Sequence, residues 1–427
     1  MSSNLIYEFC KKIFPINRSI TGKGVCETLK IIQGELPSLK IHNIPTGKKC
    51  FDWNIPKEWN VNEAYIIDPD GKKICSLKDN NLHLVGYSVP VNKTIELEEL
   101  EKHLHSLPGQ PDAIPYITSY YKETWGFCIS HNQRESLKEG NYRVIIDSSL
   151  IDGYMTYGEL LIEGNSKEEI FISTYICHPS MANNEVSGPA LVTFLSKFIL
   201  TLNNKRYSYR IIFIPETIGS IAYLSKNLTI MKKNIIAGFN ITCVGDNKNF
   251  SFMSSRDGST LADKVALNAL HSKGIKFKNF SYLQRGSDER QYCYPGVDLP
   301  VCSVMRSKYG DYDEYHTSLD NLSFISSDGL NGAFEIYRDI IEILENNFKY
   351  TNTQICEPQL GKRGLYPNIS SKKTIALVRT MMNLLAYCDG KLDLINISEI
   401  IDEPFWDLVE IAKKLESNGV LKKAHNK

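Results

Sequence analysis

The strongest constraint on the fold is an alternation of apolar strand-like runs with helical segments over residues 141–350. The run YRIIFIP is apolar almost throughout, which is typical of a strand covered on both faces. The segment SGPALVTFLSKFILTL just before it has helical periodicity, and further strands and helices alternate after it. This pattern predicts an α/β fold with a mainly parallel sheet flanked by helices.

The segments on either side of this pattern have a different texture. From 46 to 140, short strand-like runs alternate with turn signals, and NEAYIIDPDGKKICSL has the pattern of a hairpin. We therefore predict a small β-rich insert domain over 46–140. From 366 to 427 a helix, a short helix, a longer helix and a stub strand follow one another, which predicts a winged-helix domain. Residues 1–45 and 141–355 then form one discontinuous α/β domain.

Composition gives no sign of a polyanionic or membrane partner. Lys plus Arg and Asp plus Glu are both 49, so the formal net charge is zero. The 11 cysteines include no CxxC pair, and the start MSSNLIYEFCKK lacks the pattern of a signal peptide. No apolar stretch approaches the roughly 18 residues of a membrane span. We expect a cytoplasmic protein with free thiols and no membrane partner.

Polar residues follow successive strands at the points where sites of open α/β sheets lie. His178 follows EEIFISTYIC, Glu216 follows YRIIFIP, and Asp246 follows FNITCVG. Asp288 lies in RGSDERQY, and His316 lies just before the last long helix. Two histidines with several acids predict a divalent metal site, most simply zinc. Such a zinc ion acidifies a bound water and polarises a carbonyl group.

Each of these residues also has a structural explanation. A single histidine after a strand is more often a hydrogen-bonded structural group than a ligand, and Cys177 beside His178 has the pattern of a buried strand thiol. Glu216 would be stabilised in the first turn of a helix by the helix dipole. Asp246 before Asn247 is typical of a turn. The occurrence of all these residues in one chain favours the metal site.

Five motifs together resemble a known family. CHPSMANNEVSG, PETIGSIAYL, NITCVGD, GSDERQYCYPG and YHTSLDNL occur in this order. Their order resembles the zinc aminopeptidase clan of the leucine aminopeptidase and glutaminyl cyclase type. The likeness is greatest to a subgroup with an inserted small domain and a C-terminal winged helix, often encoded near polysaccharide-biosynthesis genes. It covers nearly the whole chain and implies a zinc exopeptidase-like fold.

The resemblance also implies roles for individual residues. His178 and His316 would be metal ligands. Glu216 would be the general base, which takes a proton from the metal-bound water and passes it to the leaving amine. The implied activity is that of a metallo-aminopeptidase-like hydrolase of amide or peptide bonds.

Three positions depart from the family pattern. Asn184 stands where the family has a bridging aspartate, and Thr217 and Thr242 stand where two-metal enzymes have a glutamate and an aspartate ligand. A neutral amide oxygen supplies a dipole but no charge, so a two-metal site is disfavoured. We expect one Zn²⁺, held by His178 and His316, with Asn184 or the adjacent Glu185 completing the ligand set.

Three acids remain as additional candidates for ligands or partners of ligands: Glu185, Asp246 and Asp288. Glu185 lies next to Asn184, but neighbours at the start of an α-helix point about 100° apart. This geometry argues against Glu185 replacing the missing aspartate. For substrate binding, Arg290 is a candidate for pairing with a carboxylate or phosphate.

Tyrosines before His316 are further candidates for the site. Tyr309, Tyr312 and Tyr315 would line a pocket or donate to an oxyanion. Their alternative role is that of surface-loop tyrosines.

These observations leave three functions open. The first is a zinc hydrolase of a small peptide or amide, including an amide of a modified sugar. The second is a catalytically impaired aminopeptidase-fold binding or scaffold protein, because Asn184 replaces an aspartate. The third is a winged-helix nucleic-acid-binding regulator, but segment 402–416 carries five acids and two lysines, the wrong sign for binding phosphates. We expect no nucleic-acid partner, and a homo-oligomer through the winged-helix or insert domain is a further expectation.

Overall fold

The structure, a computed structural model, describes residues 4–365 and 372–424. The chain divides into two compact units, the first of residues 1–263 and 276–337 and the second of residues 264–275 and 338–427. The first unit contains a large sheet and a smaller one, and the second contains a three-stranded sheet with helices.

The large sheet has eight strands and is parallel at its centre. Its order is β1 (Lys40–Pro45), β10 (Tyr154–Ile162), β12 (Ser208–Ile214), β11 (Glu169–Tyr175), β13 (Ile235–Asn240), β16 (Val301–Met305), β14 (Ser251–Met253) and β15 (Lys278–Phe280). Strands β12, β11, β13 and β16 run parallel, whereas β1, β10 and β14 join antiparallel neighbours. The predicted α/β class is confirmed, with a mixed rather than purely parallel sheet.

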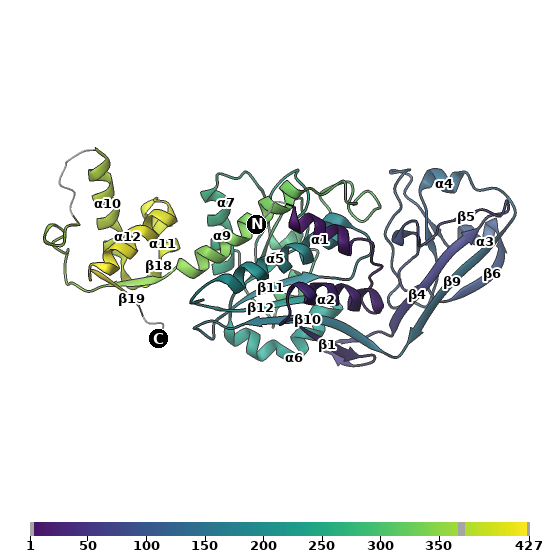
Figure 1. The fold of residues 1–427 in the computed structure, drawn as a ribbon, viewed down its shortest axis with the longest axis horizontal. Coiled ribbons are helices and arrows are strands. Elements are labelled where there is room, and N and C mark those ends of the chain that lie inside the picture. The colour runs from purple at the N-terminus through teal and green to yellow at the C-terminus, as the bar shows by residue number, and fades with distance from the viewer. Residues whose placement is uncertain (1–3, 366–371, 425–427) are drawn as a thin grey trace. The chain divides into compact units, whose positions relative to one another are not determined.

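Burial explains the position of the central strands. All seven residues of β11 are buried, as expected of a strand covered by helices on both faces. Helices α1 (Leu5–Ile13) and α5 (Ser187–Thr201) pack together through an edge-on contact of Phe9 with Phe194. In Figure 1 these helices lie above β11 and β12, and α6 (Ile218–Asn234) lies below them. Further helices are α2 (Lys23–Glu35) and α8 (Glu289–Tyr292) in the first unit, and α7 (Leu261–Ser272) and α9 (Ser327–Asn346), whose residues are divided between the two units.

The smaller sheet is antiparallel, in the order β5 (Lys73–Ile74), β4 (Glu58–Ile67), β9 (Asn141–Ile151) and β6 (Val91–Glu96). The predicted hairpin turn joins β4 to β5, with Asp68 Oδ1 accepting from the N–H groups of Asp70 and Lys72. Residues from 141 onward were predicted to belong to the α/β part, but β9 pairs with β4 and β6 in the small sheet. Its alternating burial fits a strand with one face in a core.

The second unit holds the predicted succession of helix, short helix, longer helix and strand. These are α10 (Lys372–Tyr387), α11 (Leu394–Ile401), α12 (Phe405–Ser417) and β19 (Leu421–Lys423). Two strands that the sequence analysis did not predict, β17 (Lys349–Asn352) and β18 (Asp389–Asp393), complete the sheet in the order β18-β17-β19. The predicted start at 366 lies outside the described residues, and the division into domains stays a prediction.

Two further properties concern the described chain. No described helix combines the length and the apolar character needed to cross a membrane. All 11 cysteines are free thiols, and Cys356 is the exposed one among them.

Candidate active site

The central strand β11 places His178 at the edge of the sheet. The chain leaves β11 at Tyr175, passes through His178 and enters α5 by way of a single π turn, η2 (Ala182–Val186). Short π segments inside helices often occur at functional sites. The expected separation of about 100° between the side chains of residues 184 and 185 holds for an α-helical start and does not apply to this π turn.

Glu185 contacts His178 on the side away from Glu216. Its Oε2 accepts from His178 Nδ1 at 2.9 Å and from the main-chain N–H of His178 at 3.0 Å. His178 Nε2 lies 3.6 Å from Glu216 Oε2. Burial disfavours the charged imidazole, but the neighbouring Cys177 and Glu185 outweigh it and hold the pKa of His178 well above its ordinary value.

Glu216 lies directly after β12, in the turn that opens α6. Its Oε1 accepts from Ser287 Oγ at 2.7 Å, which leaves Oε2 on the side of His178. Burial raises the pKa of Glu216, while the positive charge of His178 and the Ser287 hydroxyl act against that rise. Thr217, the next residue, has φ of +63°, a strained value for a β-branched side chain.

His316 faces His178 from a loop with left-handed backbone, at φ of +56°. The two imidazole ring centres are 5.7 Å apart, and Tyr315 stacks on His316 at 3.9 Å. The Tyr116 ring contacts both imidazoles edge-on, at 5.3 Å from His178 and 5.1 Å from His316. Burial, and then the charge of His178, lowers the pKa of His316 to about 3, so this imidazole is neutral at pH 7.

The two histidines and Glu216 open onto one cavity of about 280 Å³. One wall comes from the large-sheet region and the other from the insert. The insert contributes mostly aromatic residues, namely Trp53, Tyr116, Thr118, Tyr120 and Tyr121. Among the described residues that line the cavity, Glu216 is the one Asp or Glu, and none is Lys or Arg. This aromatic wall was not predicted, because no local motif in the insert marks it.

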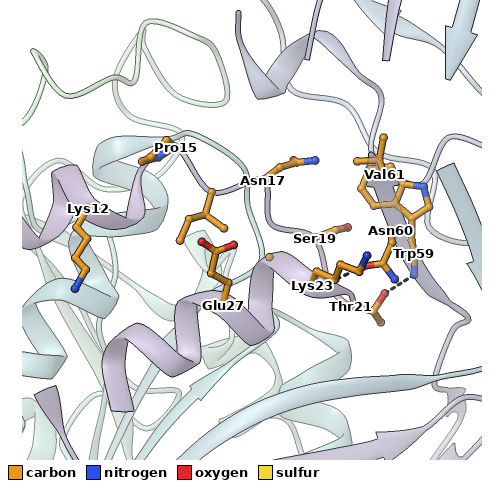
Figure 2. Close-up of a pocket in the computed structure, with 12 residues that line it drawn as sticks. Lys12, Pro15, Asn17, Ser19, Thr21, Lys23, Glu27, Trp59, Asn60 and Val61 are labelled. Atoms are coloured by element: carbon orange, nitrogen blue, oxygen red, sulfur yellow. Dashed lines mark hydrogen bonds between the residues drawn. The ribbon is translucent and has the colours of Figure 1, made fainter. Parts of the chain in front are cut away.

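A second cavity, of about 370 Å³, lies beside the segment that joins α1 to α2 (Figure 2). Residues 12–27 line it on one side and residues 59–61 of β4 on the other. Lys23 N–H donates to Asn60 Oδ1, and Trp59 N–H donates to Thr21 Oγ1, which ties the segment to the insert. None of the predicted site residues lines this cavity.

Asn184 is held by neighbours rather than by the histidines. Its Nδ2 donates to Tyr175 Oη at 2.7 Å, and its main-chain oxygen accepts from Tyr175 Oη and Thr242 Oγ1. Its Oδ1 is buried and has no hydrogen-bond partner among the described residues. An unpaired buried oxygen is costly, and it is the atom that would serve as a ligand.

Asp246 and Asp288 have separate structural partners. Asp246 accepts from Asn183 Nδ2 and from the Ser307 backbone and hydroxyl, so it connects the loops after neighbouring strands. Asp288 accepts from Thr217 N–H and Ser220 Oγ at the start of α6. Burial, followed by the charge of Glu216, raises the pKa of Asp288 to about 7.

The predicted substrate-binding residues differ in their surroundings. Arg290 donates from Nη2 to Thr217 Oγ1 at 2.9 Å and from Nε to the Ser287 carbonyl. Tyr309 is buried and donates to Glu289.

One group of three metal-binding residue types with ligand atoms within 4.8 Å of one another occurs in the described part of the chain. It consists of Cys177, His178 and Glu185. Glu185 is already bonded to His178 Nδ1, and burial raises the pKa of the Cys177 thiol to about 11. This group therefore supports His178 rather than forming an ion site. At the predicted ligand positions, the donor atoms of suitable chemistry for zinc are His178 Nε2, a ring nitrogen of His316 and the unpaired Asn184 Oδ1, although Asn184 does not line the cavity that the two histidines share.

The large sheet, parallel at its centre and flanked by helices, gives this chain an aminopeptidase-like fold. A zinc aminopeptidase from Bacillus subtilis has a similar fold, with a TM-score of 0.58 at 13% identity, over 80% of this chain and 94% of that chain. Residues 7–347 match the family described as Domain of unknown function (DUF4910), and the chain belongs to this family. Residues 348–423 match the winged helix-turn-helix family. The predicted resemblance is confirmed.

Two similar proteins come from Clostridium acetobutylicum. One is assigned as a polysaccharide biosynthesis protein with an aminopeptidase-like domain, and it is 47% identical over 92% of this chain and 90% of its own length. The other is a crystal structure of a protein assigned as a peptidase. It has a TM-score of 0.93 at 43% identity and covers 99% of this chain and 97% of that chain.

Proposed function

We propose that this protein hydrolyses an amide or peptide bond with one zinc ion bound by His178, His316 and Asn184. The observation that carries the proposal is the convergence of both imidazoles and Glu216 on one cavity, with Glu216 Oε2 only 3.6 Å from His178 Nε2. The aminopeptidase-like fold and the assignments of the relatives support a hydrolase of this kind.

Zinc bound at these residues would acidify a water molecule and polarise the scissile carbonyl group. Glu216 is the general base of the proposal, because its raised pKa brings it closer to the range in which a carboxylate can take up and return a proton. Ser287 holds one Glu216 oxygen, so the other stays directed toward the cavity. The neutral His316 has a lone pair for the metal, whereas the charged His178 would release its Nε2 proton when zinc binds.

The lining of the cavity favours a substrate that has an uncharged group next to the scissile bond. Its outer wall is aromatic, and Trp53 and Tyr121 are 37% and 62% exposed there. Aromatic faces with hydroxyl groups accommodate a ring that has both apolar and polar edges. A small peptide or an amide of a modified sugar fits this description, and the second is in keeping with the polysaccharide assignment of one relative.

The test is a zinc titration of metal-free protein combined with an amide-hydrolysis assay. We expect about one zinc per chain for the natural protein and a loss of tight binding in His178→Ala and in His316→Ala. Glu216→Gln should keep the zinc and lose hydrolysis by at least about 100-fold, in line with the loss of a general base. Absence of zinc binding in the natural protein would exclude the proposal.

A second candidate function is that of an impaired enzyme kept as a binding protein. The engagement of the Asn184 amide by Tyr175, together with threonines at 217 and 242, favours it. Stoichiometric zinc without hydrolysis of any amide in a broad panel would support this alternative over the first.

A further inference from the structure

Arg18 and Glu185 contact His178 at three polar groups: the ring Nδ1, the main-chain N–H and the main-chain oxygen. Glu185 Oε2 accepts from both the ring Nδ1 and the main-chain N–H of His178. Arg18 Nε donates to the main-chain oxygen of His178 at 3.1 Å. The ring and both main-chain polar groups of this one residue are therefore held by a single pair of side chains.

The two side chains also hold each other. Arg18 Nε lies 3.2 Å from Glu185 Oε1, an ion-pair distance, and both side chains are fully buried. Arg18 Nη1 donates to the carbonyl of Ile13 at 2.6 Å, which anchors the guanidinium to the end of α1. A buried ion pair is weak evidence for stability, because its desolvation cost offsets its attraction. Its placement around one histidine therefore calls for another explanation.

We infer that Arg18 and Glu185 are positioning residues for His178, which keep the proton on Nδ1 and direct Nε2 into the cavity. The inference rests on the proposed function in that Nε2 is taken as a zinc ligand. A carboxylate on the outer nitrogen of a metal-binding histidine fixes the orientation of the ring and raises its basicity as a ligand. Arg18 in turn fixes the rotamer of Glu185 and supplies the charge that a buried carboxylate needs.

This assignment gives a role to two features that the sequence alone left unconnected. Arg18 lies 160 residues before His178, in the segment between α1 and α2, and belongs to no motif of the zinc site. Glu185 carries the negative charge next to the neutral Asn184. Its carboxylate lies behind His178 and so supports the metal indirectly instead of replacing the missing aspartate.

A purely structural role is the alternative, and the chain offers a matched control for it. Arg210 and Glu169 form another buried ion pair, with Nε 2.5 Å from Oε2. Glu169 begins β11 and Arg210 lies on the neighbouring β12, whereas His178 follows the other end of β11, so this pair lies away from the cavity. Glu185→Gln and Glu169→Gln thus make the same chemical change in two buried ion pairs, of which the second keeps Glu159 Oε1 at 3.1 Å from Arg210.

The first measurement is zinc affinity by competition with a chromophoric chelator, at one pH and with Zn²⁺ alone as the probe. Glu185→Gln and Arg18→Met should each weaken zinc binding by about 10- to 100-fold. Glu169→Gln should leave the zinc affinity within twofold of that of the natural protein, even if it lowers the unfolding midpoint as much as Glu185→Gln does. Equal effects of Glu185→Gln and Glu169→Gln on zinc affinity would overturn the inference.

The second measurement needs no metal and no turnover. In protein labelled with ¹⁵N-histidine, His178 should show a proton on Nδ1 with a strongly downfield resonance, and Glu185→Gln should move it upfield. Glu169→Gln should not move it. A deprotonated Nδ1 in the natural protein would overturn the positioning role. If the proposed function were wrong but the positioning role correct, the natural protein would bind no zinc while His178 Nδ1 still carried its proton.

Discussion

At the scale of single residues, the neutral Asn184 is the residue on which the proposed zinc site depends most. Tyr175 and Thr242 surround it, and its Oδ1 lacks a partner among the described residues. A carboxylate at this position would give a metal ion a charged ligand. In the absence of metal, however, it would be a buried charge close to Asp320, whose Oδ2 accepts from the Asn184 N–H.

Asn184→Asp should therefore have opposite effects with and without zinc. We expect zinc to bind at least about tenfold more tightly, because the ligand gains a full charge. The metal-free variant should lose about 1–3 kcal/mol of unfolding free energy through burial of an unpaired carboxylate. Calorimetric zinc titration and urea unfolding measure the two effects. Unchanged affinity would show that residue 184 is not a ligand.

Asp288 provides a pH-dependent prediction for the metal-free protein. Its pKa rises from an ordinary 3.8 to about 7 in the folded state, so the folded chain binds this proton more tightly than the unfolded chain does. Its contribution to stability is complete below about pH 4 and is lost as the pH rises through 7. The full loss is at most about 4 kcal/mol.

Asp288→Asn should accordingly flatten the pH dependence of stability between pH 5 and 8. Urea unfolding at pH 5 and pH 8 measures the unfolding free energy, and comparison with the natural protein removes the contribution of other titrating groups. If the variant and the natural protein showed the same difference in unfolding free energy between the two pH values, Asp288 would not be the group that titrates.

At the scale of elements, the strands and helices could be predicted because continuous apolar runs and helical periodicity are local properties of the sequence. β11 and β12 followed from their continuous apolar runs, and the helix after His178 followed from its spacing. The π turn before that helix did not, because it depends on contacts such as Asp320 with the N–H groups of Asn183 and Asn184. The β-rich texture after residue 46 was visible, but the pairing of β9 with β4 and β6 was not.

The junction of the π turn with α5 depends on a close approach at Gly188. A Cβ there would lie 2.5 Å from Thr174 Oγ1 and 2.7 Å from the Ile241 carbonyl. We expect Gly188→Ala to cost about 1–3 kcal/mol through overpacking and to weaken zinc binding, since the same turn carries Asn184. Thermal and urea unfolding with a zinc titration measure both effects.

Gly34→Ala in α2 is the matched control, because nothing lies within 4 Å of the added Cβ. It should gain up to about 1 kcal/mol from helix propensity and leave zinc affinity unchanged. A Gly188→Ala variant that behaved like Gly34→Ala would show that the strand ends can move away from α5.

At the scale of the whole molecule, the site combines segments that are far apart in the sequence. The motifs located His178, Glu216 and His316, because each lies next to a recognisable strand or helix end. No local pattern indicated that Arg18 or Tyr116 would reach the same place. Such contacts depend on how the N-terminal segment and the insert fold back onto the large sheet, which single-sequence patterns do not encode.

The insert is joined by backbone to the loop that carries His316. Tyr116 N–H donates to the His316 carbonyl at 2.9 Å, and Pro115 forms a bridge with Thr317. A hinge motion of the insert would therefore pull His316 away from His178 rather than merely widen the cavity mouth. Such a motion would also separate two ligands of the proposed zinc site. Substrate exchange then favours movement of the Trp53 and Tyr121 side chains at the rim over displacement of the insert as a whole.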